Sequence, residues 1–247
     1  SMAGIEVEED DPVALTDLPA TAGPVEVGPD ARVYVGVDAG TLGAIRDRGR
    51  RGPGGAILRL NPEGTVPADN PRGPRDPVWA SGLGRAADLA FDADGRVWVA
   101  DPVARWIVRL GPGEDAGWPV IRGRLDEPLE RLAAREIGPL FRSAAWVPDR
   151  GAPTAVARLR SPAWGATLAV GLDDGRVVRI RPEGTVRAGA VAGPLDGPVV
   201  DLAEGPDGRL WALTPSTLWR IDPPGIAPFE RGRGAVADTV APAPRPY

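Results

Sequence analysis

The 247-residue sequence contains no histidine and no cysteine. Without cysteine the chain forms no disulfide and offers no thiol nucleophile, and zinc sites built from His and Cys ligands are excluded. A Ser-His-Asp triad is excluded as well. Lysine and glutamine are also absent, so all 29 basic residues are arginine. Carboxylates, tyrosine, arginine and hydroxyl groups are therefore the side chains left for proton transfer. A GC-rich genome would suppress lysine but explains the missing histidine and glutamine less well, so an engineered or computed sequence stays open as the alternative.

Long apolar runs and basic stripes are absent too. No run of 18 apolar residues occurs, which predicts that the chain has no membrane span. The formal net charge is −5, with an acidic run at Glu6–Asp11 and arginines scattered singly, so we expect no nucleic-acid partner. No signal peptide is recognisable, and Ser1-Met2 resembles a remnant of an expression vector, which leaves the native compartment undecided. We expect a soluble monomer.

Glycine and proline are abundant by contrast, at 33 and 29 residues, and they punctuate a repeated module. Such a frequency of turn formers predicts many short strands joined by tight turns. Four times, a turn leads into one strand and then into a second strand with an arginine at a fixed place. The second strands are Ile57–Leu60, Ile107–Leu110, Val177–Ile180 and Leu218–Ile221. Their arginines, Arg59, Arg109, Arg179 and Arg220, lie 50, 70 and 41 positions apart, which suits propeller blades with inserted loops.

The modules predict an all-β fold, a β-propeller of four-stranded antiparallel blades, with four blades expected and five as the alternative. Residues 12–225 would form a single propeller domain, preceded by an acidic arm at 1–11 and followed by a Pro/Ala-rich tail at 226–247. The strands that line the central channel are predicted at Pro24–Val27, Asp88–Phe91, Ser143–Val147 and Val199–Leu202. A closed ring hides its sheet edges, so a strand near Val13–Thr16 is expected beside Leu218–Ile221.

Other side chains of the modules have expected structural roles. Trp98 and Trp211 share one module position and should both be buried between blades. Each recurring arginine is expected to lie along a neighbouring strand and pair with an aspartate of the adjacent turn. Asp69-Asn70-Pro71 reads as a structural Asx-Pro turn. The insertion at Glu127–Gly138 has helical spacing and a terminal glycine, so it predicts a helix.

One segment and its surroundings resemble a known family. Gly55–Pro71 reads G-A-I-L-R-L-N-P-E-G-T-V-P-A-D-N-P and closely resembles the G-K-I-L-R-x-x-P-D-G-x-x-P-x-D-N-P signature of the soluble PQQ-dependent sugar (glucose/sorbosone) dehydrogenases. Trp79–Leu83 and Leu89–Phe91 resemble the family's next blade, and Gly117-Trp118-Pro119 matches its N-Y-G-W-P turn. The resemblance implies a six-bladed propeller that holds PQQ and calcium over a central funnel, in a secreted or periplasmic protein.

The residues that this family uses for chemistry do not carry over. Its catalytic histidine lies in an H-x-G-G segment that reads Ala20-Thr21-Ala22-Gly23 here. Its G-x-R-N-P cofactor segment reads Gly82–Ala86, which leaves Arg85 one position out of register as a weak candidate for cofactor binding. The family's first one to two blades also have no counterpart in this chain. The sequence therefore resembles a truncated member of the family that lacks its catalytic histidine.

Two aspartates are the best candidates for a site. Asp88 and Asp201 fall at the same place in two predicted channel strands. Two carboxylates converging there could bind a cation, or act as an acid and base if their pKa values differ. The alternative is that both are solvated channel residues or cap turn backbone. A carboxylate beside a wet channel is expected to keep a low pKa and to be a weak base.

Two functions stay open. The first is a non-catalytic propeller scaffold or binding module, with a small molecule or a protein as its partner at the central channel and no cofactor. The second is a divergent PQQ- and calcium-dependent sugar dehydrogenase in which Asp88 or Asp201 replaces the missing histidine. The sequence favours the first, because several site positions of the family are lost together.

Overall fold

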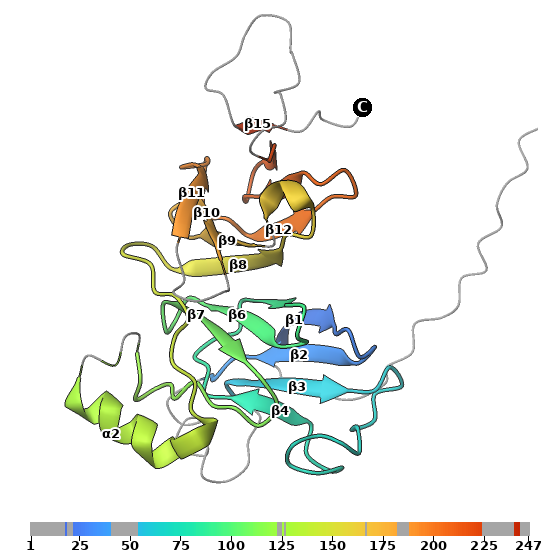
Figure 1. The fold of residues 1–247 in the computed structure, drawn as a ribbon, viewed down its shortest axis with the longest axis vertical. Helices are drawn as coiled ribbons and strands as arrows, with labels where there is room; N and C mark the ends of the chain where they lie inside the picture. The colour runs from blue at the N-terminus through green and yellow to red at the C-terminus, as the bar shows by residue number, and fades with distance from the viewer. Residues whose placement is uncertain are drawn as a thin grey trace, which may run out of the picture.

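The computed structural model describes residues 18, 22–40, 54–122, 125, 127–165, 167–181, 188–223 and 240–242. Four antiparallel sheets make up most of this part of the chain (Figure 1). The first sheet contains β1 (Ala22–Val27), β2 (Val33–Val37), β3 (Ala56–Leu60) and β4 (Val78–Ser81). The second contains β5 (Asp88–Phe91), β6 (Val97–Asp101) and β7 (Trp106–Leu110). The third contains β8 (Pro153–Arg158), β9 (Leu168–Leu172), β10 (Val177–Ile180) and β11 (Ala188–Ala192), and the fourth β12 (Asp201–Glu204), β13 (Leu210–Leu213), β14 (Leu218–Ile221) and β15 (Val240–Pro242).

The strand pairing confirms the repeated module. Trp98 faces Arg109 across β6 and β7, and Trp211 faces Arg220 across β13 and β14 at the same register. The hairpin turns that precede these strands contain Gly95 at φ +73° and Gly208 at φ +74°. Glycine recurs there because other residues rarely adopt a positive φ.

The first strand of each sheet lies next to the first strand of the following sheet. β1 contacts β5, β5 contacts β8, and β8 contacts β12. These four are the inner strands, and β1, β5 and β12 overlap their predicted positions. The third prediction, Ser143–Val147, is wrong. There Trp146 pairs with Ile107 of β7, at the outer side of the second sheet, and the true inner strand begins ten residues later at Pro153.

The ends of the row of sheets also differ from the prediction. β15 pairs with β14, so the position expected for a strand near Val13–Thr16 is taken by Val240–Pro242. Val13–Thr16 itself lies outside the described residues. β1 and β12 do not contact each other as the neighbouring inner strands do, so the described residues form an arc and not the closed ring that the modules predicted.

The apolar core lies in the spaces between successive sheets. Tyr34 packs edge-on against Trp79 and Phe91 between the first and second sheets, with ring centroids 5.4 and 4.7 Å apart. Trp98 and Ile107 pack with residues of the third sheet. The predicted helix is confirmed as α2 (Pro128–Ile137), which is followed by the short 3-10 helix η2 (Gly138–Leu140).

Local interactions and packing explain the limits of α2. Glu127 and Glu130 form a capping box, in which the Glu127 N–H donates to Oε2 of Glu130 at 3.2 Å. The helix covers part of the first core cluster with Ala133, Ala134 and Ile137. No helix in the described ranges is long and apolar enough to cross a membrane.

Trp98 and Trp211 differ in burial although they share a register. Trp98 is 1% exposed, and its Nε1–H donates to Oδ2 of Asp92 at 3.0 Å. Trp211 is partly exposed, so the expectation that both are buried is right for Trp98 and wrong for Trp211. The difference in burial follows from the order of the sheets. The third sheet covers Trp98 of the second, whereas no fifth sheet follows the fourth, which contains Trp211, within the described residues.

Trp98→Ala should therefore lower the free energy of unfolding by roughly 3–5 kcal/mol, the usual cost of emptying a large core site. Trp211→Ala should cost no more than about half as much, because its partly exposed ring gains less from folding. Urea titrations of the two variants and the parent chain measure the difference. Equal midpoints for the two variants would contradict this account of the sheet order.

Candidate functional site

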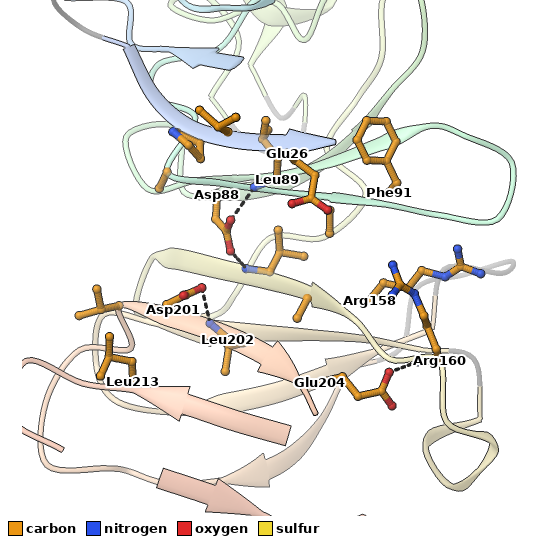
Figure 2. A pocket seen from close by; sticks show the side chains of 17 residues that line it. Glu26, Asp88, Leu89, Phe91, Arg158, Arg160, Asp201, Leu202, Glu204 and Leu213 are labelled. Carbon is orange, nitrogen blue, oxygen red and sulfur yellow. Dashed lines mark hydrogen bonds between the residues drawn. The ribbon is translucent and has the colours of Figure 1, made fainter. Parts of the chain in front are cut away.

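A cleft of about 650 Å³ opens between the four inner strands. Its lining comes from β1, β5, β8 and β12, with one residue of β13 (Figure 2). The inner strands are the edges of their sheets, so each exposes one side of its backbone to this space. Because side chains alternate along a strand, every second residue of an inner strand can also point toward the cleft.

Asp88 and Asp201 are brought to this cleft together, as the sequence predicted. Asp88 is the first residue of β5 and Asp201 is the first residue of β12, and both line the cleft. Each carboxylate accepts the N–H of the next residue, from Leu89 at 2.8 Å and from Leu202 at 2.7 Å. These local bonds fix both side chains at the start of their strands.

Asp88 makes a further bond across the junction of two sheets. Its Oδ2 accepts the N–H of Val156 in β8 at 2.7 Å (Figure 2). The pKa of Asp88 is raised to about 7, first by burial and to a smaller extent by the charges of Asp201 and Glu26, while the two backbone donors oppose the shift. The expectation of a well-solvated carboxylate with a low pKa is therefore wrong for Asp88, because β8 packs against its side chain.

Asp201 is exposed, in contrast to Asp88. The two aspartates share one feature: the bonds that they make within the described residues come from backbone N–H groups, and no described arginine forms an ion pair with either. They were also candidate metal ligands. No group of three or more His, Cys, Asp or Glu side chains converges anywhere in the described ranges, so the aspartate pair gains no third protein carboxylate.

The far end of the cleft carries both signs of charge. Arg158 ends β8, and Arg160 follows two residues later. The Glu204 carboxylate accepts the N–H of Arg160 at 2.5 Å and that of Ser161 at 2.8 Å, which ties β12 to the third sheet. Burial raises the pKa of Glu26, and the charge of Arg160 opposes that rise. Sequence reasoning missed these four charged residues, because their positions follow no shared pattern.

Arg85, the candidate for cofactor binding, lies outside the cleft lining. Its side chain is exposed, and its Nε lies 3.6 Å from Oδ2 of Asp38. Its backbone N–H donates to Oδ1 of Asp101 at 3.2 Å. The structure therefore does not bring Arg85 together with Asp88 and Asp201.

Asp101 is a structural residue that the sequence analysis missed. Its side chain is fully buried and accepts N–H groups from Gly84 at 2.7 Å, Val103 at 3.0 Å and Ala104 at 2.9 Å. Burial raises the pKa of Asp101, and these donors oppose the rise. The Asp101-Pro102 step at the end of β6 is the sequence signal that could have identified this residue. The carboxylate fastens the segment after β4 to the β6–β7 turn.

Three of the four repeated arginines pair with an aspartate of an adjacent turn, as the sequence predicted. Arg59 lies 2.8 Å from Oδ2 of Asp30, Arg109 donates to Asp94 at 2.7 Å, and Arg220 lies 3.7 Å from Oδ1 of Asp222. Arg179 instead donates to the carbonyl of Trp164 at 3.4 Å. The arginines thus hold turns and strands together.

The Asp69-Asn70-Pro71 turn is structural, as expected. Asn70 is buried, and its Nδ2 donates to the carbonyls of Arg59 and Asp76 at 3.2 and 3.1 Å. Asp69 accepts bonds from both terminal nitrogens of Arg59, at 2.9 and 3.1 Å. The segment on which the family resemblance rests therefore packs around one arginine.

The sequence profile of the Glucose / Sorbosone dehydrogenase family matches residues 16–220. The chain belongs to this family. A curated relative, the uncharacterised protein slr1608 of Synechocystis, is 31% identical over 180 residues, which are 65% of this chain and 42% of that protein.

Solved structures show the fold that the family shares with this chain. The PQQ-bound aldose sugar dehydrogenase of Streptomyces coelicolor aligns with a TM-score of 0.59 and 23% identity over 89% of this chain. A structure described as glucose dehydrogenase aligns with a TM-score of 0.65 and 23% identity over 79% of this chain. At this identity the likeness supports the fold alone, and it confirms that the sheets are propeller blades. This chain spans 60% of the length of each structure.

The titration of Asp88 is directly measurable. The carboxyl carbon of Asp88 and the amide of Val156 should titrate together with a midpoint near pH 7, because the carboxylate accepts that amide. Asp201→Asn should lower the midpoint, since it removes one of the negative charges that raise the pKa of Asp88. Carbon-detected and amide NMR across pH 4–9 would follow both signals. A carboxyl midpoint near 4 would contradict the burial of Asp88.

The same shift predicts how stability depends on pH. Unfolded Asp88 releases its proton near its ordinary pKa of 3.8, whereas the folded chain holds that proton up to about 7. The folded state therefore binds more protons in this window, and the contribution of Asp88 to the free energy of unfolding falls as the pH rises through it. Urea unfolding of the parent chain and Asp88→Asn at pH 4.5 and 8 should show a smaller loss with pH in the variant. Identical losses would contradict the prediction.

Proposed function

We propose that this chain is a propeller module that binds a small ligand in the inner-strand cleft and does not oxidise sugars with PQQ. The charge of the cleft carries this proposal. Its lining includes the carboxylates of Glu26, Asp88, Asp201 and Glu204 and the guanidinium groups of Arg158 and Arg160. The acids outnumber the arginines, so the cleft attracts cations and neutral polar ligands more than anions.

The residues of the cleft do not fit the family's cofactor. PQQ is a quinone with three carboxyl groups, so holding it requires several cationic or N–H donors. The end of the cleft with Asp88 and Asp201 would repel such an anion, and at the other end the arginines are accompanied by Glu26 and Glu204. Calcium takes about six to eight oxygen ligands. The described residues provide no cluster of acidic side chains that could start such a site.

The missing histidine supports the same conclusion. The family resemblance implies a histidine base, and the sequence contains no histidine at any position. A base for sugar oxidation has to accept a proton near neutral pH. Any replacement must therefore be a carboxylate whose pKa is raised by its surroundings.

One observation favours a second candidate, a divergent sugar dehydrogenase with Asp88 as its base. Burial places the pKa of Asp88 at about 7, which suits acid–base catalysis at neutral pH. Both of its oxygens, however, already accept backbone N–H groups, from Leu89 and Val156. Both bonds lower the pKa of Asp88 and so weaken it as a base, and we rank this candidate second.

Adding PQQ and calcium should give no aldose-dependent reduction of an acceptor dye, because the cleft disfavours the anionic cofactor. The cofactor's absorbance should also stay unchanged when the protein is added. Dye reduction measured with a set of aldoses tests the first point, and a spectral titration tests the second.

Asp88→Asn and Glu136→Gln serve as paired variants in the same assay. Both remove one negative charge, but Glu136 lies exposed on α2 and does not line the cleft. Sugar-dependent turnover that disappears in Asp88→Asn and persists in Glu136→Gln would replace our proposal with the second candidate.

A further inference from the structure

We propose that the cleft binds a small hydroxylated primary amine, with its ammonium group between the carboxylates of Asp88 and Asp201. This inference rests on the proposed function, because it names the ligand class of the same cleft.

The two aspartates lack the arginine countercharge that Asp92 and Glu114 have. Asp92 lies 2.5 Å from Arg109, and Glu114 lies 2.7 Å from Arg142. Within the described residues, Asp88 and Asp201 accept hydrogen bonds only from backbone N–H groups, although both line the cleft. Their charges also act on each other, since Asp201 raises the pKa of Asp88. A cation placed between them would relieve both the repulsion and the desolvation cost.

Apolar side chains lie beside Asp201, because Val200 precedes it and Leu213 pairs with it across β12 and β13. Val25, Val200 and Leu213 line the cleft and are 60%, 52% and 41% exposed, so they form an accessible apolar rim. A rim of this kind excludes water from a bound ligand and strengthens the attraction between opposite charges. It also suits the carbon frame of an organic amine better than a hydrated metal ion.

The opposite end of the cleft suits hydroxyl groups. Figure 2 shows Arg158, Arg160 and Glu204 on the other side of the cleft from Asp88 and Asp201. Asp201 and Glu204 are the two ends of β12, which places them about 10 Å apart along the strand. Guanidinium donors beside carboxylate acceptors can bond the two faces of a hydroxyl group, which both donates and accepts. A ligand with an amine at one end and hydroxyl groups along its carbon chain therefore matches the cleft, which has the aspartates at one end and the arginines with Glu204 at the other.

Binding of an ammonium group should release protons. The charges that act on the pKa of Asp88 are those of Asp201 in β12 and Glu26 in β1, and β8 offers it the N–H of Val156, so every charged group that shifts this pKa is an acid. A bound cation favours the ionised carboxylate and lowers the pKa of Asp88. Because that pKa is about 7, Asp88 holds roughly half a proton at pH 7, and the complex should release most of it.

Three sugars of one ring type test the ligand class on the full chain by calorimetry at pH 7. Glucosamine carries the ammonium group, N-acetylglucosamine blocks its charge, and glucose replaces it with a hydroxyl group. We expect glucosamine to bind roughly tenfold more tightly than the other two, the usual gain from bonds to a charged group. Repeating the titration in buffers with different ionisation enthalpies should show proton release with glucosamine only.

Charge-neutral variants locate the site. Asp201→Asn should weaken glucosamine binding roughly tenfold and leave glucose binding unchanged. Asp88→Asn should also abolish the proton release, and Asp201→Asn keeps the test valid if Asp88→Asn does not fold. Glu136→Gln removes a charge on α2 and should change neither quantity.

The outcomes separate this inference from the proposed function. Equal affinity for all three sugars, lost in Asp201→Asn, would overturn the amine and leave a cleft that binds sugars. Absence of binding by all three, or glucosamine binding that both aspartate variants leave intact, would also overturn the amine. The proposed function falls on a different result, PQQ-dependent aldose oxidation.

Discussion

The structure depends on the packing of each sheet against the face of the next. The second and third sheets bury side chains on both faces, as the fully buried strands β6 and β9 show, so each needs a neighbour on either side. Trp98 and Ile107 of the second sheet meet that need by packing against the third. The inner strands come together as a result, and the cleft forms where their edges meet. Burial between sheets thus determines both the core and the site.

The sequence predicts the features that depend on interactions within a single sheet or helix. The fixed spacing of turn, strand and arginine predicts the hairpins around Trp98 and Trp211, and the caps of α2 predict its limits. Because Asp88 and Asp201 share a module position, their arrival at one cleft was predictable too. Contacts between sheets are harder to read. The exposure of Trp211 and the burial of Asp88 depend on which segment lies against them, and no local pattern contains that information.

The history of the family and the chemistry of the cleft point in different directions. The match over residues 16–220 and the shared fold identify the ancestry. The absence of histidine and the excess of carboxylates in the cleft are the grounds on which we propose a different ligand. A propeller would permit such a change, because cores between the blades, such as the one around Tyr34, hold the fold while the inner edges stay open to substitution. Arg59 and Asp69 show the same division, since they preserve a family segment for structural reasons.

The bond from Val156 to Asp88 links recognition to mechanics. The carboxylate that would meet the proposed ligand also joins β5 to β8. Glu204 does the same between β12 and the third sheet through Arg160 and Ser161. A ligand that binds these carboxylates would compete with the hydrogen bonds that join neighbouring blades. Binding would therefore change how rigidly the four sheets are held together. The carboxylate oxygens of Asp88 and Glu204 therefore cannot give the tightest ligand binding and the most rigid joining of the blades at the same time.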